Sequence, residues 1–316
     1  MKNKKMLGNI LLIITAVIWG TAFAAQRAGM DKIEPLTFNA ARMALAAVAV
    51  GAVAFFMRIK DKRSGGRRTE QEQKQYDKNT VKGGILCGCF LSAASILQQI
   101  GLVHTTAGKA GFITALYILI VPVIGVVFFK RKNTWLVWLC VLAGLVGMFL
   151  LCINGEFRLS RGDALVCGCA FVFSFHIITC DHYVKKGDPV SMSAIQFVTA
   201  TVISTAAAFI AEKPDVDKII SAAVPILYCG LMSGGVGYTL QIVAQKFTDP
   251  TVASLLMSME SVFAVIGGVV LLHERMSVRE VIGCVIMFAA IILVQIPLPV
   301  KGGGTKARKA DQEEKI

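Results

Sequence analysis

Ten long apolar stretches constrain this 316-residue chain more than any other feature of its sequence. A bilayer core about 30 Å thick is crossed by roughly 20 residues of helix. Membrane-spanning strands would instead alternate apolar and polar residues over about ten positions. We therefore expect an all-α membrane protein with ten transmembrane helices, at residues 7–26, 37–57, 83–102, 107–129, 135–153, 163–182, 192–211, 223–244, 252–272 and 279–296.

The composition leaves too little polar surface to cover a soluble globule of this size. Hydrophobic residues make up 55% of the chain, charged residues only 17%, and the mean hydropathy is +0.65. The net charge of +13 would favour a nucleic-acid partner only if the basic residues gathered on one folded face. Because they are distributed among loops, we expect the lipid bilayer as the main surroundings and no nucleic-acid partner.

The basic residues favour one set of loops. With the N-terminus in the cytoplasm, inside segments hold 23 Lys and Arg, outside segments hold 9, and Arg42 lies within a helix. This asymmetry is the positive-inside signature. It predicts a multi-pass protein of the cytoplasmic membrane with both termini cytoplasmic. The first half supplies most of the asymmetry, so the orientation of the second half depends on the helix count.

The two halves of the chain align without a gap at a shift of 143 residues. Gln98 then meets Gln241, and Tyr117 meets Glu260. Each half carries five helices, an odd number, so the second copy enters the membrane from the opposite side. This pattern predicts two inverted five-helix repeats, an architecture of many secondary transporters.

The repeats and the hydrophilic segments define the expected domains. We assign residues 1–156 to the first repeat and 157–297 to the second. Within the first repeat, residues 58–82 mix nine basic with four acidic residues and should form a mobile cytoplasmic linker beside anionic headgroups. Residues 298–316 combine glycines with alternating charges, so we expect a disordered cytoplasmic tail.

All nine cysteines fall inside the expected helices. Cys87 with Cys89, and Cys167 with Cys169, lie two residues apart, which points each pair to different sides of a helix. That spacing does not suit a shared metal ion. We expect the thiols to pack as small apolar groups, and we expect no metal site and no cofactor.

Glu260 is the sharpest candidate for a binding residue. It lies about ten residues into the ninth stretch, near the bilayer midplane, where a charge is costly unless it faces a partner or a cavity. There it can bind a proton or the ammonium group of a substrate. The alternative is a structural hydrogen bond between helices, which retention of transport in Glu260→Ala would favour.

Other polar residues within the stretches extend this candidate site. Arg42, with Asn39 on nearly the same helical face, either receives a substrate carboxylate or pairs internally. Uncharged polar groups suit a zwitterionic or hydroxylated solute, although bonding between helices explains many of them. Trp19 beside Gly20 allows a close helix approach next to a cavity wall. The expected substrate-binding residues are Glu260, Tyr117, Gln98, Gln241, Trp19, His176 and Arg42.

The segment from His176 to Asp181 matches an H-x4-D pattern known from acyltransferases. It raises a membrane-embedded transferase as an alternative function. Residues five apart on a continuous helix point about 140° away from each other, so the two cannot easily act on one proton. We therefore expect no catalytic residue and no enzyme activity, with His176 lining a cavity.

Four stretches, at residues 19–26, 35–42, 105–112 and 250–277, resemble the drug/metabolite transporter (DMT) superfamily, in particular its EamA-type permeases. The resemblance implies a basket of ten helices, cytoplasmic termini and a central cavity. Similar proteins export amino acids or other metabolites, and more distant ones carry nucleotide sugars. The family often has proline directly after the ninth-helix glutamate, where this chain has Ser261, so a kink at Glu260 is in doubt and Pro122 is the expected breaker.

These features predict a secondary carrier, and more specifically an exporter, of small polar metabolites such as amino acids. It would work by alternating access around a midplane site. The chain has no P-loop motif, so it carries no ATPase of that kind. A nucleotide-sugar-like exchanger and a channel stay open, although no ring of charges typical of a channel is visible. The solute, the coupling ion and the oligomeric state, including a homodimer, are also open.

Overall fold

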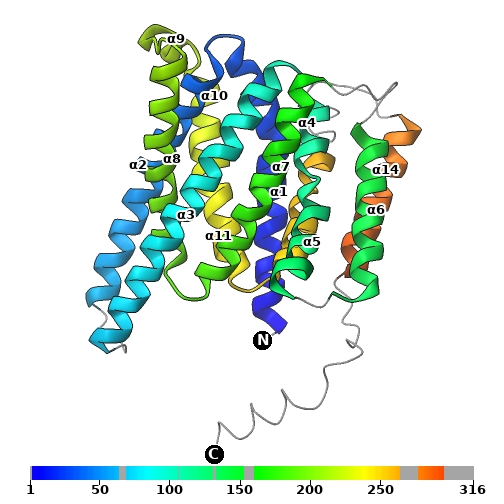
Figure 1. Ribbon diagram of the computed structural model, residues 1–316, viewed down its shortest axis with the longest axis horizontal. Coiled ribbons are helices and arrows are strands. Elements are labelled where there is room, and N and C mark those ends of the chain that lie inside the picture. The colour runs from blue at the N-terminus through cyan, green and yellow to red at the C-terminus, as the bar shows by residue number, and fades with distance from the viewer. Residues whose placement is uncertain are drawn as a thin grey trace, which may run out of the picture.

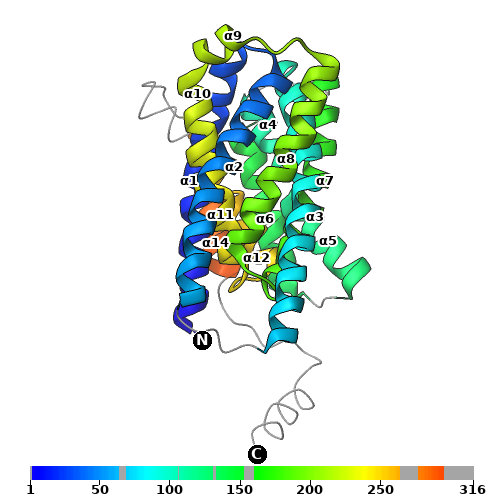
Figure 2. The same cartoon turned by 90° about the vertical axis from the view of Figure 1, so that its left-hand side faces the viewer.

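The computed structural model describes residues 2–63, 69–105, 107–130, 133–152, 160–263 and 277–294. These residues contain helices and connecting turns and no strand, and the helices form an elongated bundle (Figures 1 and 2). Seven described helices are long and apolar enough to cross a membrane, and two shorter apolar helices span Trp135–Leu150 and Val281–Val294. The predicted all-helical fold class is therefore confirmed for the described residues.

The chain runs up and down the bundle, and α1 begins at the lower end in Figure 1. The helices of the first half are α1 (Lys2–Met30), α2 (Pro35–Arg63), α3 (Glu70–Val103), α4 (Ala107–Thr114), α5 (Tyr117–Phe129) and α6 (Trp135–Cys152). Those of the second half are α7 (Arg161–Val184), α8 (Pro189–Ala211), α9 (Val216–Ser221), α10 (Ala223–Leu227), η1 (Tyr228–Tyr238), α11 (Thr239–Gln245), α12 (Pro250–Met257) and α14 (Val278–Val294). The expected ninth stretch is described only to residue 263, so the number of membrane crossings stays a prediction. The expected tail, residues 298–316, lies outside the described residues.

Residues 58–82, which we expected to be a mobile linker, are helical at both ends. α2 continues to Arg63 and α3 begins at Glu70, while residues 64–68 lie outside the described part. Thr69 caps α3, since its backbone N–H donates to Glu72 Oε2 at 2.8 Å and its side chain accepts from the Glu72 N–H. Such a capping box stabilises a helix whatever its hydropathy. The helices α2 and α3 are therefore longer than the apolar stretches from which they were predicted.

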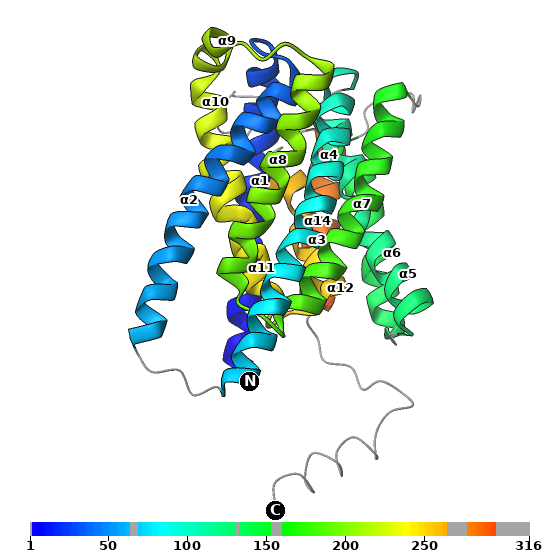
Figure 3. The same cartoon turned by 60° about the vertical axis from the view of Figure 1, so that its left-hand side comes forward.

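The two halves of the chain meet where α3 runs beside α7 and α8 (Figure 3). Two glycines on one face of α3 allow its close approach to α8. A Cβ on Gly84 would lie 2.6 Å from Ile195 Cβ, and a Cβ on Gly88 would lie 2.5 Å from Thr199 Cβ. Small residues four apart are typical of close helix contacts within membranes. The contact gives the bundle an interface at which the first and second halves pack directly.

Two of the expected stretches are interrupted near their middle. α4 ends at Thr114 and α5 begins at Tyr117, while α12 ends at Met257 and the chain becomes helical again at Glu260. The two interruptions, at residues 115–116 and 258–259, are separated by the same 143 residues that align the halves of the sequence.

Backbone hydrogen bonds between residues three apart form both interruptions. Leu116 N donates to Ile113 O at 3.2 Å, and Met259 N donates to Leu256 O at 3.3 Å. Such bonds tighten the helix into a 3₁₀-like turn. Neither turn contains proline, since Pro122 lies inside α5, so the expected breaker is not the cause of the interruption.

The eighth expected stretch contains an 11-residue π-helix, η1, which includes the glycine-rich run from Ser233 to Gly237. Two side chains of α1 donate to its carbonyl oxygens. Trp19 Nε1 lies 3.1 Å from Ser233 O, and Thr15 Oγ1 lies 3.3 Å from Gly237 O. π-Helices are rare and occur frequently at functional sites. This one therefore directs attention to the space between α1 and η1.

Candidate functional site

A partly open cavity, about 470 Å³ with the space at its mouth included, lies inside the bundle and is bounded by helices of both halves. The apolar part of its lining comes from α1 and α7. The lining residues whose side chains carry a polar group are Trp19, Gln26, Arg42, Gln98, Thr114, Tyr117, Ser233, Tyr238, Gln241 and Glu260.

The structure brings most of the sequence-predicted binding residues to this cavity. The six that line it are Trp19, Arg42, Gln98, Tyr117, Gln241 and Glu260. His176 is outside the lining: it is fully buried on α7, with Nε2 3.0 Å from Gln196 Oε1. The buried polar position that we expected to face the cavity is therefore used for contact between α7 and α8.

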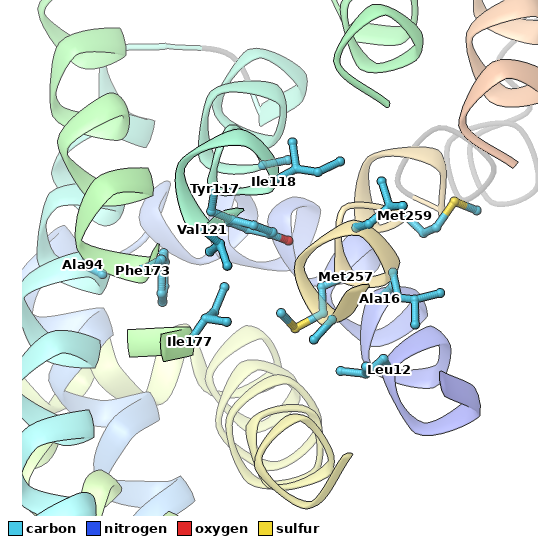
Figure 4. Packing of buried hydrophobic residues seen from close by; sticks show 14 of the residues in the cluster. Leu12, Ala16, Ala94, Tyr117, Ile118, Val121, Phe173, Ile177, Met257 and Met259 are labelled. Atoms are coloured by element: carbon cyan, nitrogen blue, oxygen red, sulfur yellow. The ribbon is translucent and has the colours of Figure 1, made fainter. Parts of the chain in front are cut away.

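Tyr117 and Glu260 contact each other across the two halves of the chain. The Tyr117 hydroxyl donates to Glu260 Oε1 at 3.1 Å, and Figure 4 shows it reaching from α5 toward the segment that carries Met257 and Met259. Each is the first helical residue after an interruption. Within the described residues the second carboxyl oxygen, Oε2, has no hydrogen-bond partner. It is the carboxyl atom that can accept a hydrogen bond from a solute.

Arg42 is held by neutral groups. Its Nε and Nη2 atoms donate to Asn39 Oδ1 at 3.0 and 2.8 Å, and Nη1 donates to Gln26 Oε1 at 3.0 Å. Asn39 is in turn fixed by its Nδ2 atom, which donates to Ser95 and Ser204 hydroxyls. A guanidinium has five N–H donors, so two remain. The acceptors among the described residues are all amide oxygens, which leaves the positive charge available to an anion in the cavity.

Two glutamines add uncharged groups to the lining. Gln98 Nε2 donates to Thr114 Oγ1 at 3.2 Å, and Gln241 Nε2 donates to Gln245 Oε1 at 3.4 Å. Gln241 Oε1 is buried and has no hydrogen-bond partner within the described part of the chain. A buried acceptor without a partner is costly, so this atom marks a position where a solute N–H or O–H would fit.

Sequence reasoning missed Gln26, Thr114 and Tyr238 as site residues. Tyr238 packs on Trp19 with ring centroids 4.6 Å apart, and it stacks on Phe173 at 6.4 Å, so aromatic rings close one side of the cavity. Gln26 and Thr114 are polar residues at the ends or middle of apolar stretches. Gln98 was predicted because it is a polar residue within an apolar stretch, and the same criterion would have identified Gln26 and Thr114.

The two residues of the H-x4-D pattern have different partners. Cys180 Sγ lies 3.7 Å from His176 Nε2, whose hydrogen-bond partner is Gln196. Asp181 Oδ1 accepts from Lys185 Nζ at 2.6 Å. His176 therefore binds a neighbouring helix inside the bundle, whereas Asp181 forms an ion pair with Lys185. These separate contacts give no support to the transferase alternative.

Comparisons with known proteins cover nearly the whole chain. A protein of Archaeoglobus fulgidus named as an uncharacterized transporter is 26% identical over 294 residues, 93% of this chain and 87% of that protein. The uncharacterized transporter YoaV of Bacillus subtilis is 23% identical, with 92% and 96% of the two chains covered. A crystal structure with 14% sequence identity superposes with a TM-score of 0.72 over 91% of this chain and 96% of the other, which shows a shared fold. The EamA-like transporter family model matches residues 6–153 and 160–296, so the chain belongs to the EamA-like transporter family and is a multi-pass membrane transporter.

Proposed function

We propose that the protein is a secondary carrier that exports small zwitterionic metabolites, such as amino acids, across the cytoplasmic membrane. The observation that carries the proposal is a single cavity with both Arg42 and Glu260 in its lining. Neither residue neutralises the other through a hydrogen bond, because Arg42 binds amide oxygens and Glu260 binds Tyr117. The cavity therefore presents one basic and one acidic group to a solute.

The free atoms of the lining match the groups of an amino acid. A substrate carboxylate takes the two remaining N–H donors of Arg42, in the bidentate geometry that guanidinium groups favour. The ammonium group donates to Glu260 Oε2, and Gln241 Oε1 accepts from a further N–H or O–H. A zwitterion brings no net charge into the bilayer, so the large cost of moving a net charge through hydrocarbon is avoided.

Alternating access supplies the transport step. The interruptions at residues 115–116 and 258–259 support two inverted five-helix repeats, because equivalent positions of both halves have the same local hydrogen bonding. The separate family matches to residues 6–153 and 160–296 support the division into repeats at 1–156 and 157–297. Ten crossings, with both termini cytoplasmic as the charge asymmetry favours, then place the cavity between two units that rock against each other.

Untargeted metabolite profiling of medium and cell extract tests this function without a guess about the solute. Cells producing the wild type are compared with cells producing Glu260→Gln at matched membrane levels. Glu70→Gln, at the exposed start of α3, is the matched control. We expect a few amino acids or similar zwitterions to accumulate outside only with the wild type and Glu70→Gln. Identical profiles for all three proteins would refute the assignment of Glu260 to the site.

A further inference from the structure

Three metal-ligating side chains meet between α3 and α7, outside the lining of the cavity. They are Cys87 on α3 and His176 and Cys180 on α7, and all three are fully buried. Each offers one ligand atom, and these atoms all lie within 4.8 Å of one another. Among the described residues this is the group of His, Cys and acidic side chains that is spaced to hold a metal ion.

The distances between the donors are those of a tetrahedral zinc site. Zn–S bonds are about 2.3 Å long and Zn–N bonds about 2.0–2.1 Å, which puts two thiolates about 3.8 Å apart and a thiolate about 3.5 Å from an imidazole nitrogen. Cys87 Sγ and Cys180 Sγ are 3.5 Å apart. Cys180 Sγ lies 3.7 Å from His176 Nε2 and 3.9 Å from Nδ1. These two pairs lie within a few tenths of an ångström of the expected distances, and the third pair, Cys87 and His176, lies within 4.8 Å. The three donors leave the fourth tetrahedral position to a water or a small ligand.

The positions of the three donors along their helices favour a shared metal ion. His176 and Cys180 lie four residues apart on α7 and so share one face, the spacing with which two histidines of a helix hold zinc in H-E-x-x-H proteins. Cys87 comes from the neighbouring α3. Gln196 Oε1 lies 3.0 Å from His176 Nε2, which orients the ring and leaves Nδ1 as the metal ligand.

The charges of the site also favour a divalent ion. Two thiolates and a neutral imidazole around Zn²⁺ have a net charge of zero, which suits a position inside the bilayer. The buried side chain of Met192 packs in the same cluster as Cys87 and Cys180, so the surroundings are apolar and rich in sulfur. Such surroundings favour thiophilic ions over hard cations such as Mg²⁺.

We propose that Cys87, His176 and Cys180 bind one Zn²⁺ ion, which joins α3 of the first half to α7 of the second. Binding converts two thiols to thiolates, so each Zn²⁺ bound releases two protons, and no oxidant or reductant is needed. The expectation of no metal site considered only cysteines two apart on one helix, whereas the proposed ligands come from two helices. The site is independent of the solute that the cavity binds, so its test requires no transport assay.

The test measures zinc on the purified full-length protein with its thiols kept reduced. The protein is loaded with Zn²⁺, desalted, and analysed for zinc per chain by elemental mass spectrometry. We expect about one zinc per chain for the wild type and at least about a tenfold loss for Cys87→Ser and Cys180→Ser. Cys140→Ser removes a buried thiol of α6 and should retain the metal.

A second measurement keeps the proposal testable if the two site variants fail to fold. Co²⁺ replaces Zn²⁺ in the wild type, and tetrahedral thiolate ligation is recognised by its strong visible absorption and its sulfur-to-cobalt charge-transfer band. Absence of these bands, or a wild type that retains no zinc, would overturn the site. A Cys87–Cys180 disulfide that persists under reducing conditions, detected by mass spectrometry of the chelator-treated protein as the loss of two hydrogens, would overturn it as well.

Discussion

The two interrupted helices of the bundle have the same backbone and different chemistry. Both tighten at equivalent residues, 115–116 and 258–259, and both place a polar side chain at the first position of the next helical turn. In the first half that side chain is the neutral phenol of Tyr117, and in the second it is the carboxyl of Glu260. Their contact at 3.1 Å joins a phenol and a carboxyl at aligned positions of the two halves. Under the proposed repeat, these equivalent positions carry different side chains, and the carboxyl supplies the acidic group of the proposed carrier.

Exchanging the two side chains tests this comparison most severely. Glu260→Tyr removes the acidic group and should lower transport in proteoliposomes at least about tenfold, since hydrogen bonds to charged groups contribute about 1.5–3 kcal/mol. Adding Tyr117→Glu restores an acid and a phenol in exchanged positions and should recover part of the loss. A double variant no more active than Glu260→Tyr alone would break the proposed equivalence of the two halves.

Removing the basic group should separate classes of solute. Arg42→Gln keeps hydrogen-bonding capacity beside Asn39 and Gln26 but removes the charge and the two unused N–H donors. We expect about tenfold weaker competition by amino acids, from the loss of a charge-assisted bond, and little change for the corresponding amines. Competition is measured against a labelled solute in vesicles. Equal losses for amino acids and amines would mean that Arg42 has a structural role alone.

Tyr117→Phe should have a smaller effect than changes at Glu260. It removes the hydroxyl that orients the Glu260 carboxyl and leaves the carboxyl itself in place. We therefore expect the solute concentration for half-maximal transport to rise roughly two- to tenfold, which corresponds to about 0.5–1.5 kcal/mol. Initial transport rates across a range of solute concentrations measure it. A loss as large as that of Glu260→Tyr would indicate that the hydroxyl itself touches the solute.

The smallest effect is expected at a partly exposed carboxyl, which contrasts with the buried Glu260. Glu34, in the turn between α1 and α2, accepts a hydrogen bond from Lys218 of α9, and this bond lowers the pKa of Glu34 below its usual 4.5. A lowered folded-state pKa stabilises the protein above pH 4.5 and the contribution is lost as the pH falls below it. Glu34→Gln should therefore slightly lower the melting temperature near neutral pH and not at acidic pH, with transport unchanged. A melting temperature equally affected at both pH values would contradict the ion pair's role.

Much of the cavity could be predicted because a polar residue in an apolar stretch is visible in the sequence. Gln98 and Gln241 were found in this way, Trp19 was found from its neighbour Gly20, and the 143-residue shift had already aligned Tyr117 with Glu260. The interruption at Glu260 could not be predicted, because it forms without proline through bonds between residues three apart. The hydroxyl of Ser258, which donates to Leu255 O at 2.8 Å, accompanies it.

The cluster of Cys87, His176 and Cys180 could not be predicted from the sequence, because its residues come from two helices. Spacing along one helix describes which residues share a face, but it says nothing about which face of another helix meets it. The closeness of α3 to α8 depends on glycines such as Gly84 and Gly88, and on the neighbours that they admit. The H-x4-D pattern drew attention to Asp181, whereas packing placed Cys87 of α3 beside Cys180.

The sequence by itself determined that the chain is a helical membrane protein, because the length and continuity of its apolar stretches are local properties that decide whether a segment can span the bilayer. It also determined which polar residues lie within those stretches. Only the tertiary structure decided that Arg42 binds neutral amides, that Tyr117 donates to Glu260, and that His176 lies outside the cavity lining, beside Gln196. These pairings depend on how helices rotate and approach one another, which is set by side-chain packing among segments far apart in the chain.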